Sequence, residues 1–397
     1  MMIVEGIIRT KTKIHVTSAL DASTKINADG QIGAEDARIP LSRTYRTVAF
    51  TPNGRRVEVP FFPGNSIVGR MRRAVTSMIA ESLRSRGEQI SRTTYRGISC
   101  GAADPKPEML GLNVDEYAAY LKDPHIGIFG GGKRLYEGGF KMFDMVPITQ
   151  ATIEAGMVPE DFIEHMAMLS VGEEGRPASR ITGIDVLHRR DDLIDGVGEE
   201  IVQTISDFDG LSADMKQEAV RKAQAAAKRA GVKTEDDAPA VDRISMSQQS
   251  AREYIVPGIA MYFKAALRKR VTKAQLGVWV LGLQAVLNDN EFGGVSHLGY
   301  GEMNLADAAT NLTLHGDEVS GPLFSLVRKG GKDQLEVCHP EALEAVREAQ
   351  AWIASVTNES FESFYTASVP ESSGDEKKAK GKGKEKAEAP GEKEGAR

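Results

Sequence analysis

One stretch constrains the fold more than any other part of the chain, namely residues 59–74, VPFFPGNSIVGRMRRA. An apolar strand ends there at a Pro-Gly pair, which favours a turn, and a helical pattern follows. Asn65 and Ser66 stand where a helix N-cap is expected, and a helix N-terminus favours anions because its first N–H groups are unpaired. Arg70 and Arg73 add guanidinium groups to the same helix. The stretch therefore predicts a strand-turn-helix unit that binds phosphate.

Charge is distributed unevenly along the chain. The 397 residues carry a formal net charge of −6, yet residues 38–96 contain twelve arginines, no lysine and three acids, so that this segment has a net charge of +9. A second basic cluster lies at residues 264–273. Such asymmetry indicates one face for a polyanion and an acidic remainder that faces water or a basic neighbour. Solvated helix faces are the alternative explanation for both clusters.

The patterns of several other protein classes are absent from the sequence. The two cysteines, Cys100 and Cys338, provide neither a disulfide framework nor a paired zinc motif. The chain has no uninterrupted apolar run of about 18 residues, and its first residues do not resemble a signal peptide. We therefore expect a cytoplasmic protein with no membrane partner, no metal and no cofactor.

The hydrophobic pattern predicts an antiparallel sheet backed by helices, which is an α+β fold. Residues 170–190 indicate an extended arm, and residues 191–242 are charged and Ala-rich, which is typical of an exposed helix and a linker. From Ser368 onward the chain lacks core-forming side chains and is expected to be disordered. The expected elements are strands at 3–18, 43–50, 56–61, 141–149 and 253–263, and helices at 66–86, 114–121, 273–287 and 340–355.

Two glycine-dense segments allow close approach of the backbone: the first could cradle a phosphate with its N–H groups, and the second would let the chain approach another backbone closely. The first, residues 130–134, reads Gly-Gly-Gly-Lys-Arg and does not fit the P-loop pattern, because no Ser or Thr follows its lysine. The second, residues 293–301, reads GGVSHLGYG and contains no GxGxxG fingerprint. Ser296, His297 and Tyr300 offer polar contacts or a stacking ring in the second segment. A structural turn is the alternative in both cases.

Acidic residues after the first strand are the only candidates for metal-assisted chemistry. Asp21, Asp29, Glu35 and Asp36 lie in one Gly-rich loop and could bind Mg²⁺ beside a phosphate. A solvated loop is the more ordinary explanation of such acids.

Taken in chain order, these pieces resemble one family. The chain is similar to the RAMP superfamily of CRISPR-associated proteins in five pieces, namely a β-branched first strand, PFFPGNSIVGRMRRAV, IFGGG, an arm containing residues 180–183 (Arg-Ile-Thr-Gly) and FGGVSHLGYGEMN. The resemblance is greatest to the Cas-seven-like backbone subunit of type IV CRISPR-Cas systems. It covers residues 3–305 in patches.

The resemblance implies an RRM-like (ferredoxin-like) antiparallel-sheet palm with an inserted helical finger domain and a thumb hairpin. The corresponding ranges are palm at 1–87, 126–170 and 250–366, finger insertion at 88–125, thumb arm at 171–192, a charged helical insertion at 193–249 and a disordered tail at 367–397.

The resemblance also implies that copies of the chain polymerise along a guide RNA (crRNA), together with other CRISPR effector subunits. The guide would be bound through phosphate and sugar, and its spacer bases would pair with target DNA or RNA. Phosphate binding falls on Asn65, Ser66, Arg70 and Arg73. Further RNA contacts are expected from Arg38, Arg43, Lys133, Arg134, Arg176, Arg180, Arg189, Gly293, Gly294, Ser296, His297, Gly299 and Tyr300.

The sequence departs from the family pattern in two places. Asn65 replaces a more common serine, and residues 33–36 (Gly-Ala-Glu-Asp) do not align with the aspartate loop that cuts target RNA in type III relatives. We therefore expect a protein that is not an enzyme. The alternatives are a metal-dependent endoribonuclease that uses an acid between Asp21 and Asp36, and a guide-processing relative that uses His297 as a general base.

Overall fold

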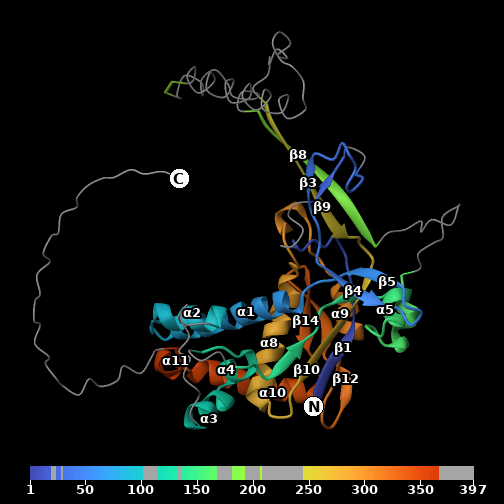
Figure 1. Cartoon of the computed structure of the whole chain (residues 1–397). Helices are drawn as coiled ribbons and strands as arrows, with labels where there is room; N and C mark the ends of the chain where they lie inside the picture. Colours follow the sequence, from blue (N-terminus) through green and yellow to red (C-terminus); the bar gives the residue numbers. More distant parts are fainter. Residues whose placement is uncertain are drawn as a thin grey trace, which may run out of the picture.

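A six-stranded antiparallel sheet forms the centre of the molecule (Figure 1). The computed structural model describes residues 1–18, 24–27, 30–101, 114–132, 136–167, 181–192, 206–207 and 245–365. The sheet order is β12-β11-β1-β10-β6, and β7 also pairs with β10. The bounds are β1 Met2–Arg9, β6 Phe140–Met142, β7 Val146–Pro147, β10 Ala260–Leu267, β11 Thr313–His315 and β12 Ser320–Pro322.

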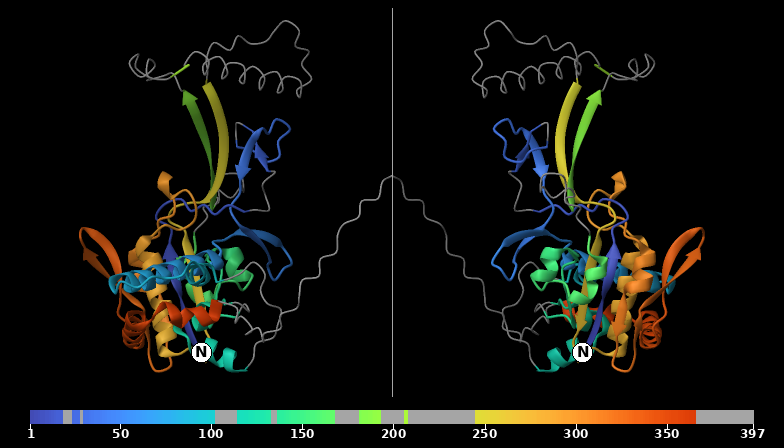
Figure 2. Two further views of the ribbon diagram at one scale, coloured as in Figure 1. Left: turned by 90° about the vertical axis from the view of Figure 1, so that its left-hand side faces the viewer. Right: turned by 90° about the vertical axis from the view of Figure 1, so that its right-hand side faces the viewer.

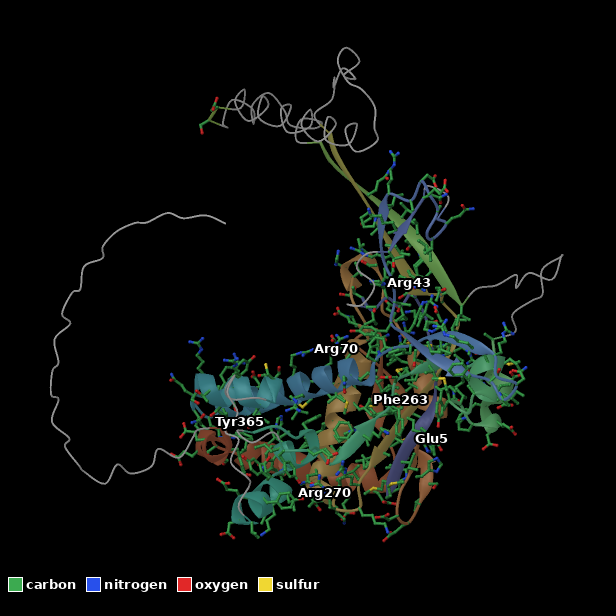
Figure 3. The ribbon with its side chains drawn as sticks, viewed as in Figure 1. Glu5, Arg43, Arg70, Phe263, Arg270 and Tyr365 are labelled. Carbon is green, nitrogen blue, oxygen red and sulfur yellow. The ribbon has the colours of Figure 1, made fainter. Side chains whose placement is uncertain are left out.

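Side-chain alternation on the two central strands divides the core in two. β1 and β10 pair over their full lengths, from Met2 opposite Leu267 to Arg9 opposite Ala260. On one face, Val4 and Phe263 join the large core beneath the helices. On the other face, Ile7 and Tyr262 join a smaller core with α5 (Gln150–Glu154). Figure 3 labels Phe263 and Glu5, which lie on opposite faces of this sheet. The expected antiparallel sheet backed by helices is therefore confirmed.

Three long helices cover the large-core face. α1 spans Gly64–Ser85, α8 spans Lys273–Asp289 and α10 spans Pro340–Ser355. α8 is buried along most of its length, and Thr272 caps it together with Gln275 in a capping box. A Cβ at Gly277 would lie 1.9 Å from the Ala345 carbonyl oxygen, so only glycine permits α8 to approach α10 this closely. The predicted helices at these three places are confirmed.

Four shorter helices add to the side of the body formed by α1 and α8, on the left in Figure 1. They are α2 (Arg92–Cys100), α3 (Val114–Lys122), α4 (Pro124–Phe129) and α11 (Asn358–Tyr365). Asp123 caps α4 by accepting hydrogen bonds from the His125 and Ile126 amides. Desolvation by burial raises the pKa of Asp123 to about 6 and lowers the pKa of His125 to about 3.

A second sheet projects from the body as a long arm (Figures 1 and 2). β8 (Thr182–Asp192) and β9 (Ser245–Ile255) pair antiparallel over eleven residues each, from Thr182 opposite Ile255. β3 (Ile39–Ser42) adds in parallel to β9, and β2 (Lys25–Ile26) follows. We call this four-stranded sheet the arm. A small core that includes Ile26, Leu41 and Ala251 closes its lower part.

The arm corrects two expectations. The single strand predicted at 253–263 is wrong, because β9 ends at Ile255 and β10 begins at Ala260, with Gly258 at φ +85° between them. β9 also begins at Ser245, inside the range assigned to the charged helical insertion. The remainder of that insertion and the tail at 367–397 lie outside the described residues, apart from residues 206–207.

Two hairpins and several short elements complete the fold. The predicted strands around Pro52 form the hairpin β4 (Arg46–Phe50) and β5 (Arg56–Pro60), which is confirmed. β13 (Phe324–Lys329) and β14 (Lys332–Val337) form another hairpin. α9 (Leu305–Asn311) follows the second glycine-dense segment, and Asn304 caps this helix. The first strand ends at Arg9, well before residue 18, and the predicted 141–149 strand divides into β6 and β7. The remaining pieces are the 3₁₀ helices Glu160–His165 and Ser296–Leu298.

Among the described helices, none combines the length and the apolar character that crossing a membrane requires.

Candidate nucleic-acid interface

The N-terminus of α1 already holds an anion of the protein itself. Pro63 occupies the N-cap position, and no side chain caps the helix. Instead, the Gly64 amide donates to a carboxylate oxygen of Asp144 at 2.8 Å. The expectation that Asn65 or Ser66 caps the helix is therefore wrong, because both lie inside its first turn. Asp144 supplies the negative charge that we expected from a phosphate.

Three of the four arginines of α1 lie in its N-terminal half and have different surroundings. Arg70 forms ion pairs with Asp289 at 2.6 Å and Glu291 at 3.7 Å. Arg72 turns inward and donates to the carbonyl groups of residues 129 and 130, and burial lowers its pKa. Arg73 is exposed and has no ion-pair partner among the described residues. The N-terminal half of α1 therefore offers one exposed guanidinium without an ion pair in the described part of the chain and one that is held by acids.

Residues 292–301, which we call the glycine loop, are held by backbone contacts with residues 13–15. Gly293 has a φ of +92°, and a Cβ there would lie 2.3 Å from the His15 carbonyl oxygen. The amides of Gly294 and Gly301 donate to the carbonyl groups of His15 and Lys13, at 2.9 Å in both cases. The Gly294 amide is therefore already used within the protein. Ser296, His297 and Gly299 are exposed on the outer turn of the loop.

Tyr300 anchors the glycine loop to the base of the arm. Its hydroxyl donates a hydrogen bond to the Asp185 carboxylate on β8, and the residue is only 6% exposed. Burial raises the pKa of this hydroxyl, and the hydrogen bond to Asp185 raises it further. Lys13 pairs with the same carboxylate at 2.6 Å and lies over the Tyr254 ring, 4.7 Å from its centroid. Tyr300 thus positions the loop, and its ring is not an open surface on which a base could stack.

A buried carboxylate holds two arginines where the arm meets the body. Glu253 is 3% exposed and pairs with Arg46 and, at 3.8 Å, with Arg43. It also accepts the Thr44 amide at 3.3 Å, and its own carbonyl oxygen lies 2.5 Å from the His15 ring. Figure 3 labels Arg43 at this junction. Arg43, expected at the RNA, is therefore part of the arm's internal support.

The first glycine segment is a packed turn. Gly131 has a φ of +115°, and a Cβ there would lie 2.5 Å from the Gly101 carbonyl oxygen. A Cβ at Gly132 would lie 2.8 Å from the Tyr120 ring. These glycines permit close packing between the turn, α2 and α3, so a phosphate cradle is not needed to explain them.

Other expected RNA contacts lie on the arm or outside the described residues. Arg38 is exposed just before β3 and has no ion-pair partner among the described residues, and Arg189 lies on β8, where only its backbone is described. The positions outside the described residues are Lys133, Arg134, Arg176 and Arg180.

The alternative catalytic residues are not brought together in the described part of the chain. Glu35 and Asp36 are exposed, whereas Asp21 and Asp29 lie outside the described residues. No group of three or more His, Cys, Asp or Glu side chains suited to a metal occurs among the residues that the structure describes.

Sequence reasoning missed four residues that shape the interface. Lys13 carries a weak signal, because it lies in the alternating segment KTKIHVT, whose odd positions are polar. Asp185, Glu253 and Asp289 carry no local signal, because their arginine, lysine or tyrosine partners are 115 to 219 residues away in the chain.

Comparisons with known proteins give no match by sequence. No protein-family model and no curated protein matches the chain. Among solved structures, the fold is similar to a chain of a "Type IV-B CRISPR Complex", with 14% identity, a TM-score of 0.40 and coverage of 83% of this chain and 96% of that one. It is also similar to a chain in "Cryo-EM structure of the Type III-B Cmr-beta bound to cognate target RNA", with 13% identity, a TM-score of 0.29 and coverage of 76% and 58%. The chain thus spans a little over half the length of the second.

Both titles name CRISPR complexes, the class of assembly that the sequence resemblance names. The function proposed below rests on the residues of this chain rather than on these likenesses.

Proposed function

We propose that the chain is a non-catalytic, RNA-binding backbone subunit of a type IV-like CRISPR ribonucleoprotein. Several copies would coat the guide RNA, bind it through phosphate and sugar, and present its bases for pairing with target DNA or RNA. The sequence resemblance motivates this proposal, and the contacts between α1, the glycine loop and the arm support it.

The central sheet is consistent with an RRM-like palm. Along the chain the elements follow the order β1, α1, β6, β10, α8, β11, and across the sheet the strands follow the order β11-β1-β10-β6. Both orders match those of a β-α-β-β-α-β unit of the ferredoxin-like kind. In this proposal the central sheet and its long helices are the palm, the short helices between α1 and β6 are the finger domain, and the β8–β9 pair is the thumb.

One observation carries the proposal, namely that the three elements expected at the RNA contact one another. Arg70 of α1 pairs with Asp289 and Glu291, which lie immediately before the glycine loop. Tyr300 then joins that loop to Asp185 at the base of the arm. Segments more than 200 residues apart in sequence are thus brought together, and we infer that a single strand of RNA lies along them.

The chemistry of these segments suits binding that ignores base sequence. Exposed Arg73 and Arg38 are phosphate donors, while Ser296 and His297 on the glycine loop offer polar contacts to sugar or phosphate. Pairing with the target would read the sequence, so no base-specific pocket is required. Because phosphate contacts displace counterions, affinity should fall steeply with salt.

Further copies of the chain and companion CRISPR subunits are the proposed protein partners. A basic surface on one copy could meet an acidic surface on the next, and such a head-to-tail contact generates a helical filament when it does not close. We further propose that the chain cuts no RNA. Incubating the loaded protein with Mg²⁺ and guide-paired RNA tests this, and cleavage at regular intervals would establish the endoribonuclease alternative instead.

Removing Arg70 and Arg73 together tests the RNA site. We expect Arg70→Ala with Arg73→Ala to weaken binding of a 30-nucleotide RNA by about tenfold, because two charge-assisted phosphate contacts are lost. Fluorescence anisotropy at several salt concentrations and with unrelated sequences measures this, and sedimentation with RNA reports filament assembly.

A matched control removes two exposed arginines elsewhere, with Arg328→Ala on β13 and Arg347→Ala on α10. The control keeps the net charge of the test variant, so it corrects for general electrostatic attraction. Wild-type affinity in the Arg70/Arg73 variant, with an unchanged unfolding transition, would refute the proposed site.

A further inference from the structure

Two carboxylates converge on the arginine at the centre of the proposed RNA site. Asp289 and Glu291 both lie within 4 Å of the Arg70 guanidinium, and no other cation among the described residues pairs with either. One positive charge therefore faces two negative charges. A phosphate that approached Arg70 in this arrangement would meet a net negative surface.

The stability of α8 does not explain the position of Asp289. Asp289 is the last residue of the helix, and Asn290 caps it in the left-handed conformation. A helix C-terminus carries partial negative charge, so an aspartate there is unfavourable. Arg70 offsets this repulsion, yet a neutral residue at position 289 would avoid it altogether.

The two sides of this ion pair differ in freedom of movement. Asp289 is held on α8, most of which is buried, and Asn290 fixes the next turn by accepting from the Met303 amide at 2.8 Å and donating to its carbonyl at 3.0 Å. Arg70 has a long side chain that is 21% exposed and can rotate about its own bonds. The guanidinium can therefore move away while the backbone that carries Asp289 stays in place.

Releasing Arg70 would not leave the acids buried without a partner. The side chains of Asp289 and Glu291 are 60% and 54% exposed. They also line a polar cavity of about 520 Å³ together with Lys11, Asn304 and Lys332. Water in that cavity can solvate both carboxylates, so the cost of losing the pair is that of a surface ion pair.

We propose that Asp289 and Glu291 compete with RNA for Arg70 and thereby set the affinity of the site. In the free protein they hold the guanidinium, and on binding Arg70 exchanges them for an RNA phosphate. Arg73, which has no ion-pair partner among the described residues, needs no such exchange. This inference rests on the proposed function, because it assumes that RNA lies along α1.

Neutralising the acids tests the competition. We expect Asp289→Asn with Glu291→Gln to tighten binding of a 30-nucleotide RNA by about threefold to fivefold, the range of a surface ion pair. The control, Glu348→Gln with Glu359→Gln, removes two exposed acids from α10 and α11 and gives the same net charge. A gain equal to that of the control would overturn the proposal.

A double-mutant cycle with Arg70→Ala separates competition from positioning. Under competition, Arg70→Ala weakens binding by less than about twofold in the wild type and by about fivefold when the acids are neutral. If the acids instead position Arg70, neutralising them weakens binding as much as Arg70→Ala does, and this result overturns the proposal.

Arg73→Ala keeps the two hypotheses distinguishable. If Arg73→Ala weakens binding but neutral acids do not strengthen it, the competition fails while the RNA site stands. If Arg73→Ala and the acid variant both leave the affinity unchanged, RNA does not lie along α1, and the proposed function fails together with this inference.

Discussion

Glu253 is the residue whose loss should most weaken the joint between the arm and the body. Its carboxylate is buried on β9 and pairs with Arg43 and Arg46, which precede and begin β4. It also accepts the Thr44 amide. Glu253→Gln keeps the size of the side chain but leaves two guanidinium groups facing a neutral amide.

The expected magnitude follows from the burial of the three side chains. Removing one partner of a buried ion pair costs about 3–5 kcal/mol, because an uncompensated charge remains. The Arg43 and Arg46 side chains are still 21% and 18% exposed, so water compensates part of the loss. We therefore expect Glu253→Gln to lower the free energy of unfolding of this joint by about 2–4 kcal/mol. Glu58, which is 43% exposed and pairs with Arg43 at 3.6 Å, gives the control Glu58→Gln, at less than about 1 kcal/mol.

Native-state hydrogen exchange can locate the loss. Amides of β9 and of residues 39–50 should exchange faster by the factor that corresponds to 2–4 kcal/mol. Trp279 and Trp352 lie on α8 and α10, so the tryptophan fluorescence transition in urea reports the body separately. If the β9 amides are as well protected from exchange in Glu253→Gln as in Glu58→Gln, the Glu253 carboxylate does not support the arm and the reasoning is refuted.

Two further predictions concern pH and the glycine loop. The pKa of Asp123 is raised in the fold, so this residue favours the folded state as pH falls from about 6 towards 4, whereas the lowered pKa of His125 costs stability below about 6.5. Asp123→Asn, which keeps the cap on α4, should therefore raise the free energy of unfolding at pH 7.5 by about 3 kcal/mol and make its decrease at acid pH steeper. Urea titrations from pH 4.5 to 7.5 measure this, and an unchanged pH profile would contradict it. Gly293→Ala should weaken RNA binding at least about fivefold, because its Cβ would meet the His15 carbonyl group. Gly299→Ala, at φ +79° in open space, should change the affinity by less than about twofold. Equal anisotropy titrations for the two alanine variants would contradict the assigned rigidity of the loop.

The helices were predictable because their signals are local. α1 and α10 place apolar residues at helical spacing, whereas α8 is an apolar run that is too long for a strand. Turn or capping residues flank α1 at Pro63 and α8 at Thr272 and Asn290. The β4–β5 hairpin was predictable for the same reason, since a Pro-Asn-Gly turn separates two short β-branched runs. In these places the sequence within about 20 residues determines the element.

The arm was only half predictable, because its strands pair across a long separation. Residues 182–190 have the alternation of a strand, but the partner strand begins at Ser245, and nothing local specifies that pairing. The error at 253–263 has a different cause, because Pro257 and Gly258 form a local turn signal inside a run that is otherwise rich in β-branched and aromatic residues. Gly258 takes a positive φ there, and the strands on its two sides belong to different sheets.

The helix cap at α1 shows how a distant residue can replace a local one. Asn65 and Ser66 satisfy the composition of a cap, yet the carboxylate of Asp144, 80 residues away, accepts the Gly64 amide. A local pattern states that a helix N-terminus needs an acceptor. It does not state whether a side chain, a distant carboxylate or a ligand provides it.

The same reasoning changes the meaning of the +9 segment. A count along the sequence treats its twelve arginines alike. In the fold, however, Arg46 and Arg70 pair with acids that lie 207 and 219 residues later, and Arg72 donates to backbone carbonyl groups. The arginines of this segment that remain exposed and without an ion pair in the described part of the chain are Arg38, Arg55, Arg73, Arg92 and Arg96. Charge asymmetry in a sequence therefore indicates a candidate polyanion-binding region, but tertiary ion pairs decide which of its cations are free for a phosphate and which, like Arg70, are already paired with an acid.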